Sequence, residues 1–392
     1  MNIQKKKMAI VCSTDYESYP MGGMMSFILD SLPFLDKYFD ITLWGVLVGE
    51  KSKTHIVING KTYPFKSFSK VKVGKKIIPN LLRVSFSIWK KQNELLADNY
   101  DVLYIHGIPL SFPFFKQNNV AVVNHIHGMT NPFSMTANRA ARNNLSIYLY
   151  ERYRDWVVKK SDMIFLASDK QGHKQFSQRY PAEENKIEYI PNFADQEIFK
   201  NISRDVARKE LGINEHETIF VNTGRVSLQK DPILLVKSFI YYIKHLKGLG
   251  KLVIIGDGEL REHIEELAKD NDIEDKLIIT GKIDRSRINL WLNAADLYVY
   301  TSHANGFPIS LAEAATCGLP IVTTDVTGVH DLVVEEKTGY LIQQRNEKLI
   351  ANAMQKALVN KEKFSQNIYE ISKAFTPEIV LEKMNKKFLS LN

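Results

Sequence analysis

Short apolar segments alternate with amphipathic segments along almost the whole chain, and this alternation restricts the possible folds more than any other feature. The apolar segments include "MAIVCS", "VAVVNHIHG", "TIFVNTG" and "LPIVTTD"; each is rich in β-branched residues and ends in Gly, Ser or Asp. Between them lie segments with helical spacing, such as "DPILLVKSFIYYIKHLK". Strands that alternate with helices predict parallel sheets with helices on both faces, which is a doubly wound α/β fold.

The alternation occurs in two series, and 392 residues are too many for one ordinary core. We expect a first domain at 1–195 and a second at 196–376, with the boundary near "IPNFADQEIFK", where the strand pattern pauses. The last segment, 377–392, has a helical pattern without a following strand; it could pack on either domain, including back on the first. Asn59-Gly60 lies between two alternating runs and predicts a hairpin inserted in the first domain.

The excess of positive charge belongs to the first half of the chain. Residues 1–195 contain 26 Lys/Arg and 17 Asp/Glu, whereas 196–392 contain 26 and 27. The stretch 51–91 carries eleven basic residues and no acidic one, which indicates an anionic partner for one domain only. Its end, "KKIIPNLLRVSFSIWKK", has two interpretations: an interfacial helix on anionic lipid, or a helix that faces the core and exposes a basic side.

Several classes of protein are disfavoured. No helix-turn-helix, zinc-finger or RNP pattern occurs, so we do not expect nucleic acid as the anionic partner. Cys12 and Cys317 cannot form a disulfide framework and are interpreted as reduced core residues. The apolar run after "KKK" is too short for a signal peptide, and no run of about 18 apolar residues could span a membrane. We expect a cytoplasmic protein, soluble or peripheral on a membrane.

Loops that follow strands carry the candidate phosphate-binding groups. In "NTGRVSLQKDP" a strand ends at Gly224, and Arg225 and Lys230 follow before a helix begins at Asp231-Pro232. Two cations at the carboxyl end of a strand can bind a diphosphate, although two solvated loop cations are the plainer interpretation. "GDGELR", from Gly256, lacks the third glycine of a dinucleotide fingerprint, and no Walker loop occurs.

Other polar residues at strand ends admit structural or functional interpretations. His125 and His127 in "NHIHG" would share a side of their strand, but no third ligand for a metal ion is evident from the spacing. His127 is the better candidate for a polar contact with a ligand, whereas His106 and His125 fit structural roles. Gly22-Gly23 before a helix could admit a phosphate or sugar. "DND" at 270–272 has the residues of a metal-binding Asp-x-Asp but the place of a solvated loop.

These motifs together resemble one family. "GRVSLQKDP", "IIGDGEL", "ITGKIDRSRINLWLNAADLYVYTS" and "NGFPISLAEAATCGLPIVTTDVTGVHDLV" are similar, in order and spacing, to the retaining GT-B glycosyltransferases of family 4 (glycosyl transferases group 1). "MGGMMSFILDSL", "HIHG" and "KIEYIPNFAD" resemble the first domain of that family. The resemblance covers nearly the whole chain and is more specific in the second half. It implies a GT-B architecture, in which two Rossmann-like domains face each other across a cleft.

The resemblance implies roles for the matching positions. Arg225 and Lys230 match the pair that binds the donor's diphosphate, and His127 matches a histidine near the donor sugar. Glu313 matches the glutamate that holds the ribose hydroxyls. The first glutamate of the family's Glu-x7-Glu motif is replaced here by Asn305. The positions expected to lie along the donor are Gly22, Gly23, Gly224, Gly256, Lys282, Ile283, Gly306, Phe307, Pro308 and Ile309.

The implied reaction needs neither a metal ion nor a cofactor. Negative charge grows on the β-phosphate as the sugar leaves, and Arg225, Lys230 and helix amides would stabilise it. The implied partners are a nucleotide sugar, a glycan acceptor that is linked to a lipid, and an anionic surface at the inner face of the cytoplasmic membrane. Because Asn305 carries no charge, either the sugar preference differs or the chain is a weakened partner subunit or lectin-like remnant. A sugar-nucleotide 2-epimerase of the same fold stays open; a dehydrogenase is disfavoured by the incomplete glycine fingerprint.

Overall fold

The computed structural model describes residues 5–17, 22–49, 52–71, 80–114, 119–129, 131–134, 143–303 and 306–391. The chain divides into two compact α/β units. Unit 1 comprises Met1–Ser168, Gly172–Pro191 and Val380–Asn392. Unit 2 comprises Asp169–Gln171 and Asn192–Ile379. The chain therefore enters unit 2 at Asn192, a few residues before the boundary expected at 195, and returns to unit 1 within the last helix.

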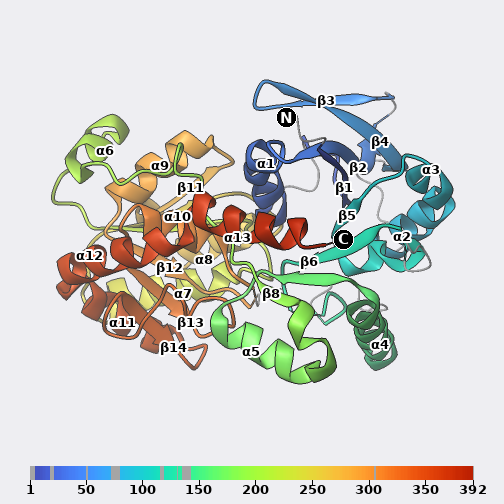
Figure 1. Cartoon of the computed structure of the whole chain (residues 1–392). Helices are drawn as coiled ribbons and strands as arrows, with labels where there is room; N and C mark the ends of the chain where they lie inside the picture. Colours follow the sequence, from blue (N-terminus) through green and yellow to red (C-terminus); the bar gives the residue numbers. More distant parts are fainter. Residues whose placement is uncertain are drawn as a thin grey trace. The chain divides into compact units, whose positions relative to one another are not determined.

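Unit 1 is built on an eight-stranded sheet with the order β3-β4-β2-β1-β5-β6-β7-β8 (Figure 1). The strands are β1 (Lys6–Cys12), β2 (Phe39–Val48), β3 (His55–Ile58), β4 (Lys61–Val71), β5 (Val102–His106), β6 (Ala121–Ile126), β7 (Met163–Leu166) and β8 (Ile187–Tyr189). All neighbouring strands are parallel except β3 and β4. Asn59 (φ 49°) and Gly60 (φ 77°) join these two with the positive φ values of a type I′ turn, which confirms the predicted hairpin.

Helices cover both faces of this sheet. They are α1 (Gly23–Leu35), α2 (Asn80–Lys90), α3 (Gln92–Leu96), α4 (Asn144–Lys160), α5 (Lys170–Arg179) and α13 (Pro377–Leu389), with the 3₁₀ turns η1 (Ile108–Leu110), η2 (Phe112–Phe114) and η3 (Pro181–Lys186). On one face, Val84 and Ile88 of α2 join the core formed by Ala9 and Val11. On the other face lies the last helix, α13, whose Phe388 ring is 4.9 Å from that of Tyr104.

Unit 2 is built on a six-stranded parallel sheet with the order β11-β10-β9-β12-β13-β14. Its strands are β9 (Ile219–Thr223), β10 (Lys251–Ile255), β11 (Leu277–Gly281), β12 (Leu297–Tyr300), β13 (Ile321–Thr324) and β14 (Gly339–Ile342). Its helices are α6 (Arg204–Leu211), α7 (Pro232–Lys244), α8 (Arg261–Lys269), α9 (Arg285–Ala294), α10 (Ile309–Thr316), α11 (Glu347–Val359) and α12 (Lys361–Ser372), with the turns η4 (Glu274–Lys276) and η5 (Lys373–Phe375). The expected pair of doubly wound parallel-sheet units is therefore confirmed.

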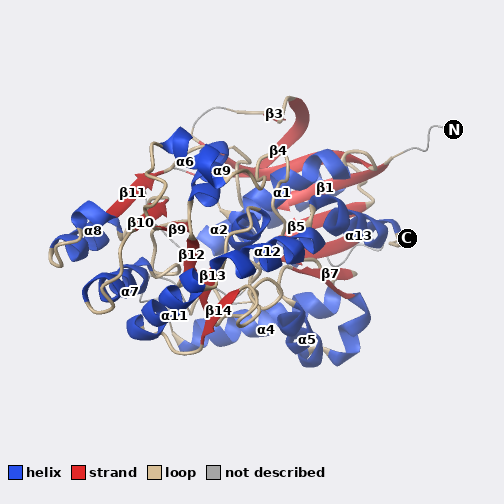
Figure 2. Ribbon diagram, turned by 90° about the vertical axis from the view of Figure 1, so that its left-hand side faces the viewer, coloured by secondary structure: helices blue, strands red, loops and turns tan. Residues whose placement is uncertain are grey.

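Alternate residues of each strand in unit 2 enter different cores, as a sheet covered on both faces requires. Val221 of β9 packs with Leu311 of α10, whereas its neighbour Phe220 packs with Phe239 of α7. The helices α7 and α11 lie side by side over the second of these cores (Figure 2). Because both faces of the sheet are covered, the strands appear in the sequence as short, largely apolar runs.

The strand orders define where ligands are expected. A doubly wound sheet binds ligands at the carboxyl ends of its strands, where the order reverses. In unit 1 the reversal lies between β1 and β5, and in unit 2 between β9 and β12. The loops that follow these strands contain Gly22, Arg225 and Thr301, and His106 is the last residue of β5.

Two further expectations from the sequence concern cysteines and membrane spans. Both cysteines are free and buried, and burial raises the pKa of the Cys12 thiol to about 12, so this thiol is unreactive at neutral pH. Within the part of the chain that the structure describes, no helix combines the length and the apolarity needed to cross a bilayer.

Candidate active site

The loops after β9 and β10 meet through their glycines. Gly256 (φ 148°) follows β10, and a Cβ atom on it would lie 1.8 Å from the carbonyl oxygen of Gly224, which follows β9. A Cβ on Gly258 would likewise lie 2.4 Å from the carbonyl oxygen of Val226. The amide of Val226 donates to Asp257 O at 3.0 Å, which joins the two loops. Only glycine permits this approach, and the result is a surface of bare backbone at the carboxyl ends of both strands.

Lys230 is held by β12, the strand on the other side of the reversal. Its Nζ lies 3.0 Å from the hydroxyl of Tyr300 and 5.0 Å from the centre of that ring. Thr301 and Ser302, which directly follow β12, form hydrogen bonds with the backbone on either side of Lys230. Thr301 Oγ1 donates to Asp231 O at 2.9 Å, and Ser302 Oγ donates to Gln229 O at 3.0 Å. The end of β12 therefore fixes the position of a cation that the β9 loop supplies.

Asp231, the residue after Lys230, already forms an ion pair with another cation, Arg345. Asp231 begins α7 as its N-cap and accepts from the amide of Leu234 at 3.1 Å. Its carboxylate also accepts from Arg345 at 2.6 Å, and Arg345 donates further to Ser302 O at 3.1 Å. No carboxylate among the described residues forms an ion pair with Arg225 or Lys230. Two cations without a carboxylate partner thus lie at the reversal point, which is the requirement for a site that binds an anionic ligand.

A glycine turn brings the start of α10 to the same edge of the sheet. Gly306 (φ 138°) donates its amide to Thr327 O at 2.8 Å, and Phe307 is buried against Phe375. The carbonyl of Phe307 accepts from Asn192 Nδ2 at 2.5 Å. Pro308 then begins α10 without a side-chain cap and without an acidic residue in the first turn. The N-terminal amides of a helix can stabilise an anion such as a phosphate. Asn305 lies outside the described residues.

Glu313 is a buried carboxylate on α10. It is 9% exposed, and the helix around it consists of small and aliphatic residues that pack into the core. Arg285 NH2 lies 4.0 Å from Glu313 Oε1, at the limit of an ion pair, and the same guanidinium lies over the ring of Phe199. Burying a carboxylate costs free energy unless charges or hydrogen bonds compensate it. The guanidinium of Arg285 is one such charge.

The turn at Gly306 is positioned by a buried hydrogen-bond cluster. Asp169 is fully buried and accepts from the amide of Gly328 at 2.7 Å and from His330 Nδ1 at 2.6 Å. His330 Nε2 lies 2.7 Å from Asp325. The bond to Asp169 raises the pKa of His330, with smaller contributions from the charges of both carboxylates. A Cβ on Gly328 would lie 2.0 Å from Gly306 O, so this cluster sets the backbone on which the turn rests.

Lys282 and Ile283 follow the outer strand β11. Gly281 (φ 68°) ends that strand, Lys282 is exposed, and Ile283 is half-buried. The expected donor positions of unit 2 therefore all follow the carboxyl ends of β9, β10, β11 and β12. Asp270 and Asp272, by contrast, lie exposed in the turn after α8, as the solvated-loop interpretation predicts.

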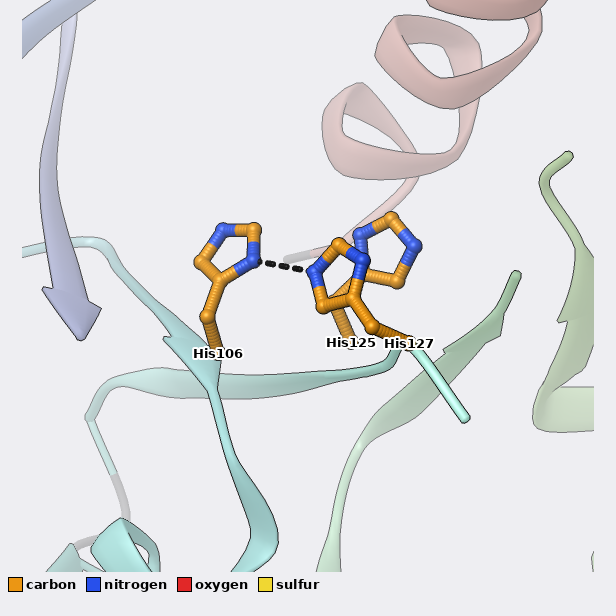
Figure 3. A group of neighbouring side chains, drawn as sticks. All are labelled: His106, His125 and His127. Carbon is orange, nitrogen blue, oxygen red and sulfur yellow. Dashed lines mark hydrogen bonds between the residues drawn. The ribbon is translucent and has the colours of Figure 1, made fainter. Parts of the chain in front are cut away.

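In unit 1, three histidines gather where β5 and β6 end (Figure 3). His106 Nδ1 lies 2.8 Å from His127 Nε2, and the His127 ring stacks on that of His125 at 4.1 Å. His125 Nδ1 lies 2.6 Å from the hydroxyl of Tyr104. Each histidine retains one buried ring nitrogen without a partner among the described residues: His106 Nε2, His125 Nε2 and His127 Nδ1. Buried polar atoms of this kind are rare and favour a site for a polar ligand or ordered water.

Burial keeps these three imidazoles neutral. It lowers the pKa of His127 to about 3 and lowers the pKa values of His106 and His125 well below the ordinary value. A neutral imidazole has one N–H donor and one acceptor nitrogen. Because one N–H is used between His106 and His127, the free nitrogens of this pair always comprise one donor and one acceptor. Such a pair suits a sugar hydroxyl, which both donates and accepts.

The distances within the cluster would also permit a metal ion, but the ring orientations do not favour one. One candidate ligand atom from each histidine lies within 4.8 Å of the others. A metal bonds in the plane of each imidazole ring, and the rings of His125 and His127 are stacked at 17°, so their planes do not meet at one point between them. As placed, the three side chains cannot direct their lone pairs at a common ion.

The glycines before α1 leave room at the same edge of the unit 1 sheet. Gly22 is the N-cap of α1, and a Cβ on it would meet no atom within 4 Å. Gly22 and Gly23 are both exposed, and the first turn of α1 contains no acidic residue. The loop therefore exposes its backbone at the edge of the sheet where β5 and β6 carry the three histidines. No contact of Gly22 requires a glycine at that position.

Known proteins with similar sequences and structures share one activity class. Residues 203–374 match the family described as glycosyl transferases group 1. A D-inositol 3-phosphate glycosyltransferase of Xylanimonas cellulosilytica is 28% identical over 196 residues, which are 47% of this chain and 46% of that protein. An Escherichia coli protein, UDP-Gal:alpha-D-GlcNAc-diphosphoundecaprenol alpha-1,3-galactosyltransferase, is 25% identical over 71% of this chain and 73% of its own. The match thus spans about half the length of the first relative and about three quarters of the second.

A solved structure extends the likeness to the whole chain. Sucrose-phosphate synthase from Thermosynechococcus elongatus has a TM-score of 0.82 at 17% identity and covers 99% of both chains. The chain therefore has the fold of the GT-B glycosyltransferases. Its family match lies entirely within unit 2, where the sequence motifs are also most specific.

Several residues that organise this candidate site could not be selected from the sequence. His106 was assigned a structural role, but the register pairs His106 with His125 on adjacent strands and brings it to His127. The matching "YIHG" and "NHIHG" patterns were the available signal. Tyr300, Arg345 and the Asp169–His330 pair gave no local signal, because their partners are distant in sequence.

Proposed function

We propose that this glycosyltransferase moves a sugar from a nucleoside diphosphate to a glycan acceptor that is linked to a lipid, with retention of the anomeric configuration. The observation that carries the proposal is the position of Arg225 and Lys230. Both lie at the reversal point of the unit 2 sheet, and neither has a carboxylate partner among the described residues. A diphosphate, with its charge concentrated on two phosphates, is the ligand that such a pair fits.

The chemistry follows from that placement. The bond between the anomeric carbon and the β-phosphate oxygen breaks, and the acceptor oxygen bonds to the same face of the carbon. The departing phosphate oxygen takes the acceptor's proton, so no side chain has to act as a base. Arg225, Lys230 and the amides at the start of α10 stabilise the charge that grows on the β-phosphate. This route requires no metal ion.

The remaining polar groups would fix the two ends of the donor. Glu313 has two acceptor oxygens for the paired hydroxyls of a ribose, and the backbone at Lys282 and Ile283 would meet the base. In unit 1, His127 would contact a sugar hydroxyl. The E. coli relative is named for UDP-Gal as its donor, which makes uridine the first base to test.

The acceptor and the place of action are proposed from unit 1. The same relative's name gives a diphosphoundecaprenol-linked acceptor. On α2, Phe86 and Trp89 are exposed beside Lys90, while Val84 and Ile88 are buried, so the helix faces the core and also presents apolar and basic groups. We therefore place the protein at the cytoplasmic face of a membrane that contains anionic lipid. Flotation on such vesicles should fall when Lys90 and Lys91 become Glu together with Lys75 and Lys76, which lie outside the described residues.

A nucleotide-release screen tests the proposal. The purified chain is incubated with UDP-, GDP- and ADP-sugars with and without EDTA, and the free nucleoside diphosphate is measured. We expect release from one class of donor, unchanged by EDTA, and a loss of at least about 100-fold in the Arg225→Ala, Lys230→Ala double variant, since two charged contacts are removed. Lys237→Ala, an exposed lysine on α7, is the control. No release from any donor would contradict the proposal, and a changed sugar without release would indicate an epimerase.

A further inference from the structure

Unit 1 contains an apolar groove outside the strand ends that hold the candidate site. Its volume is about 640 Å³, and α2, the turns η1 and η2, the segment 131–134 and α4 form it. The residues that line the groove are Ser85, Phe86, Trp89, Pro109, Phe112, Phe133, Ser146, Leu149, Tyr150 and Tyr153. None of them is charged. A concave site of this size lined mainly by aromatic side chains is typical of small-molecule binding sites.

The walls of the groove expose large apolar side chains from three separate segments. Phe86 on α2, Phe112 on η2 and Leu149 on α4 are 55%, 55% and 56% exposed. Leu145 and Tyr148, on the same helix as Leu149, are exposed as well. Single exposed apolar residues are ordinary, but a group that surrounds one groove marks a surface that binds an apolar partner.

The walls are fixed by contacts outside the groove. Val84 and Ile88 anchor α2 in the core, so Phe86 and Trp89 are turned outward and stack on each other at 5.7 Å. Asn131 Nδ2 donates to Ile147 O at 3.1 Å, which ties the 131–134 turn to α4 and places Phe133 against Tyr150. The groove is therefore built into the fold of unit 1.

Two polar groups of the wall residues are already used in hydrogen bonds within the protein. Tyr153 donates its hydroxyl to Ile108 O at 3.3 Å, and its ring stacks on Trp156. Ser146 takes part in the N-terminal cap of α4 through its amide, which donates to Asn143 Oδ1 at 2.9 Å. The groove therefore presents ring faces and methyl groups to a ligand and few hydrogen-bonding groups, which suits a hydrocarbon chain.

Positive charge lies on the two helices that form the walls. Lys90 Nζ, at the rim, is 4.7 Å from the centre of the Phe86 ring, and Arg83 and Arg152 are exposed on the same two helices. Helix α2 contains no acidic residue. An apolar groove with a cationic rim complements a hydrocarbon chain that ends in a phosphorylated head.

The groove lies close in the chain to the candidate site. Pro109 follows His106 by three residues, which is a reach of at most roughly 10 Å, and Phe133 follows His127 by six, at most roughly 20 Å. A ligand whose chain lay in the groove would therefore carry its head toward the carboxyl ends of β5 and β6.

We propose that this groove holds one hydrocarbon chain of the lipid that carries the acceptor glycan, with the phosphorylated head at the cationic rim. The inference rests on the proposed function, because it assigns the lipid part of that acceptor to a site. A single chain withdrawn into the groove would orient the glycan relative to His127, in addition to any attachment of the protein to a membrane surface.

The test uses dodecyl phosphate below its micellar concentration as the probe, titrated into the full-length protein by calorimetry. Inorganic phosphate and dodecyl maltoside separate the contributions of head and chain. Ser146→Phe fills the groove without removing apolar surface, Phe86→Ser removes part of its wall, and Leu249→Ser changes an exposed leucine of unit 2 as the control. Circular dichroism and binding of the nucleoside diphosphate that the wild type prefers, with UDP tried first, establish that each variant is folded.

We expect saturable binding of one dodecyl phosphate, weakened at least tenfold by Ser146→Phe and by Phe86→Ser and unchanged by Leu249→Ser. Vesicle flotation of Ser146→Phe should equal that of the wild type. Equal binding by the filled and unfilled groove, or no saturable binding by the wild type, would overturn the inference. So would a dimer that Phe86→Ser dissociates, since the groove would then belong to a second copy. If binding of the preferred nucleoside diphosphate persists in these cases, the proposed function stands without the groove.

Discussion

Lys230 Nζ lies 3.0 Å from the Tyr300 hydroxyl and 5.0 Å from the centre of the Tyr300 ring. Lys230, in the loop after β9, is thus held by Tyr300 at the end of β12, the neighbouring strand at which the strand order reverses. Tyr300→Phe removes the hydrogen bond but keeps the aromatic ring, so we expect donor binding to weaken by roughly tenfold or less, about 1 kcal/mol. Lys230→Ala should cost considerably more, because the charge itself is lost. Calorimetry with the preferred nucleoside diphosphate measures both, and equal losses would show that Tyr300 does more than position the lysine.

The buried histidines of unit 1 should make the protein sensitive to acid. His106, His125 and His127 have lowered pKa values in the folded state, so below the ordinary pKa of about 6.5 the unfolded chain binds more protons than the folded chain. The free energy of unfolding should therefore fall with decreasing pH, by up to about 1.4 kcal/mol per pH unit for each histidine. Urea denaturation at pH 7.5 and 5.5 measures this.

Substitutions test whether the loss of stability in acid comes from these buried histidines or from other groups of the chain. His125→Phe should reduce the loss of stability between the two pH values, whereas His263→Gln, an exposed histidine on α8, should leave it unchanged. If His125→Phe loses as much stability on acidification as the wild type does, His125 is not the buried neutral group described here.

His330 should stabilise unit 2 with the opposite dependence on pH. Its pKa is raised chiefly by the hydrogen bond to Asp169, so its stabilising effect is complete below the ordinary pKa of about 6.5 and is lost as the pH rises through the raised value. His330→Asn should therefore destabilise the protein by about 1.5–3 kcal/mol at pH 6, as expected for hydrogen bonds to charged groups, and by less at pH 9. Denaturation curves of both proteins at the two pH values provide the measurement; a difference that grows with pH would contradict the assignment.

Asn305 should influence which sugar is transferred. In the family that the sequence resembles this position is a glutamate, whereas asparagine both donates and accepts hydrogen bonds without a charge. We expect Asn305→Glu to change the ratio of rates with donors that differ only in one sugar hydroxyl, while binding of the free nucleoside diphosphate stays within about threefold. Asn305→Gln is the matched control without charge. An unchanged ratio in Asn305→Glu would place the sugar elsewhere.

The parts of the fold that depend on local sequence could be predicted well. Apolar runs with closing Gly, Ser, Thr or Asp identified most strands of both sheets, although not β8 or β14. Asn59-Gly60 identified the hairpin because positive φ at two successive positions is a local requirement. Arg225 and Lys230 could be selected because they follow a strand end, and Glu313 because its position matches a motif of the family that the sequence resembles. The structure places Arg225 and Lys230 in the loop after β9 and Glu313 on α10.

The parts that depend on strand order could not be predicted from one sequence. His106 meets His127 only because β5 and β6 are neighbours in register. Asp169 and His330 are 161 residues apart, and no periodicity connects them. The groove in unit 1 needs five segments to come together, each of which appears in the sequence as an ordinary helix or turn.

The most direct test of the central claim is the preference for a nucleoside diphosphate over its nucleoside. UDP, GDP and ADP are first screened against the wild type by calorimetry, and the one that binds is compared with its nucleoside. We predict that the Arg225→Ala, Lys230→Ala double variant loses the preference for the nucleoside diphosphate and binds the nucleoside as the wild type does. A preference that survives in the double variant would contradict the claim that these two cations bind the diphosphate.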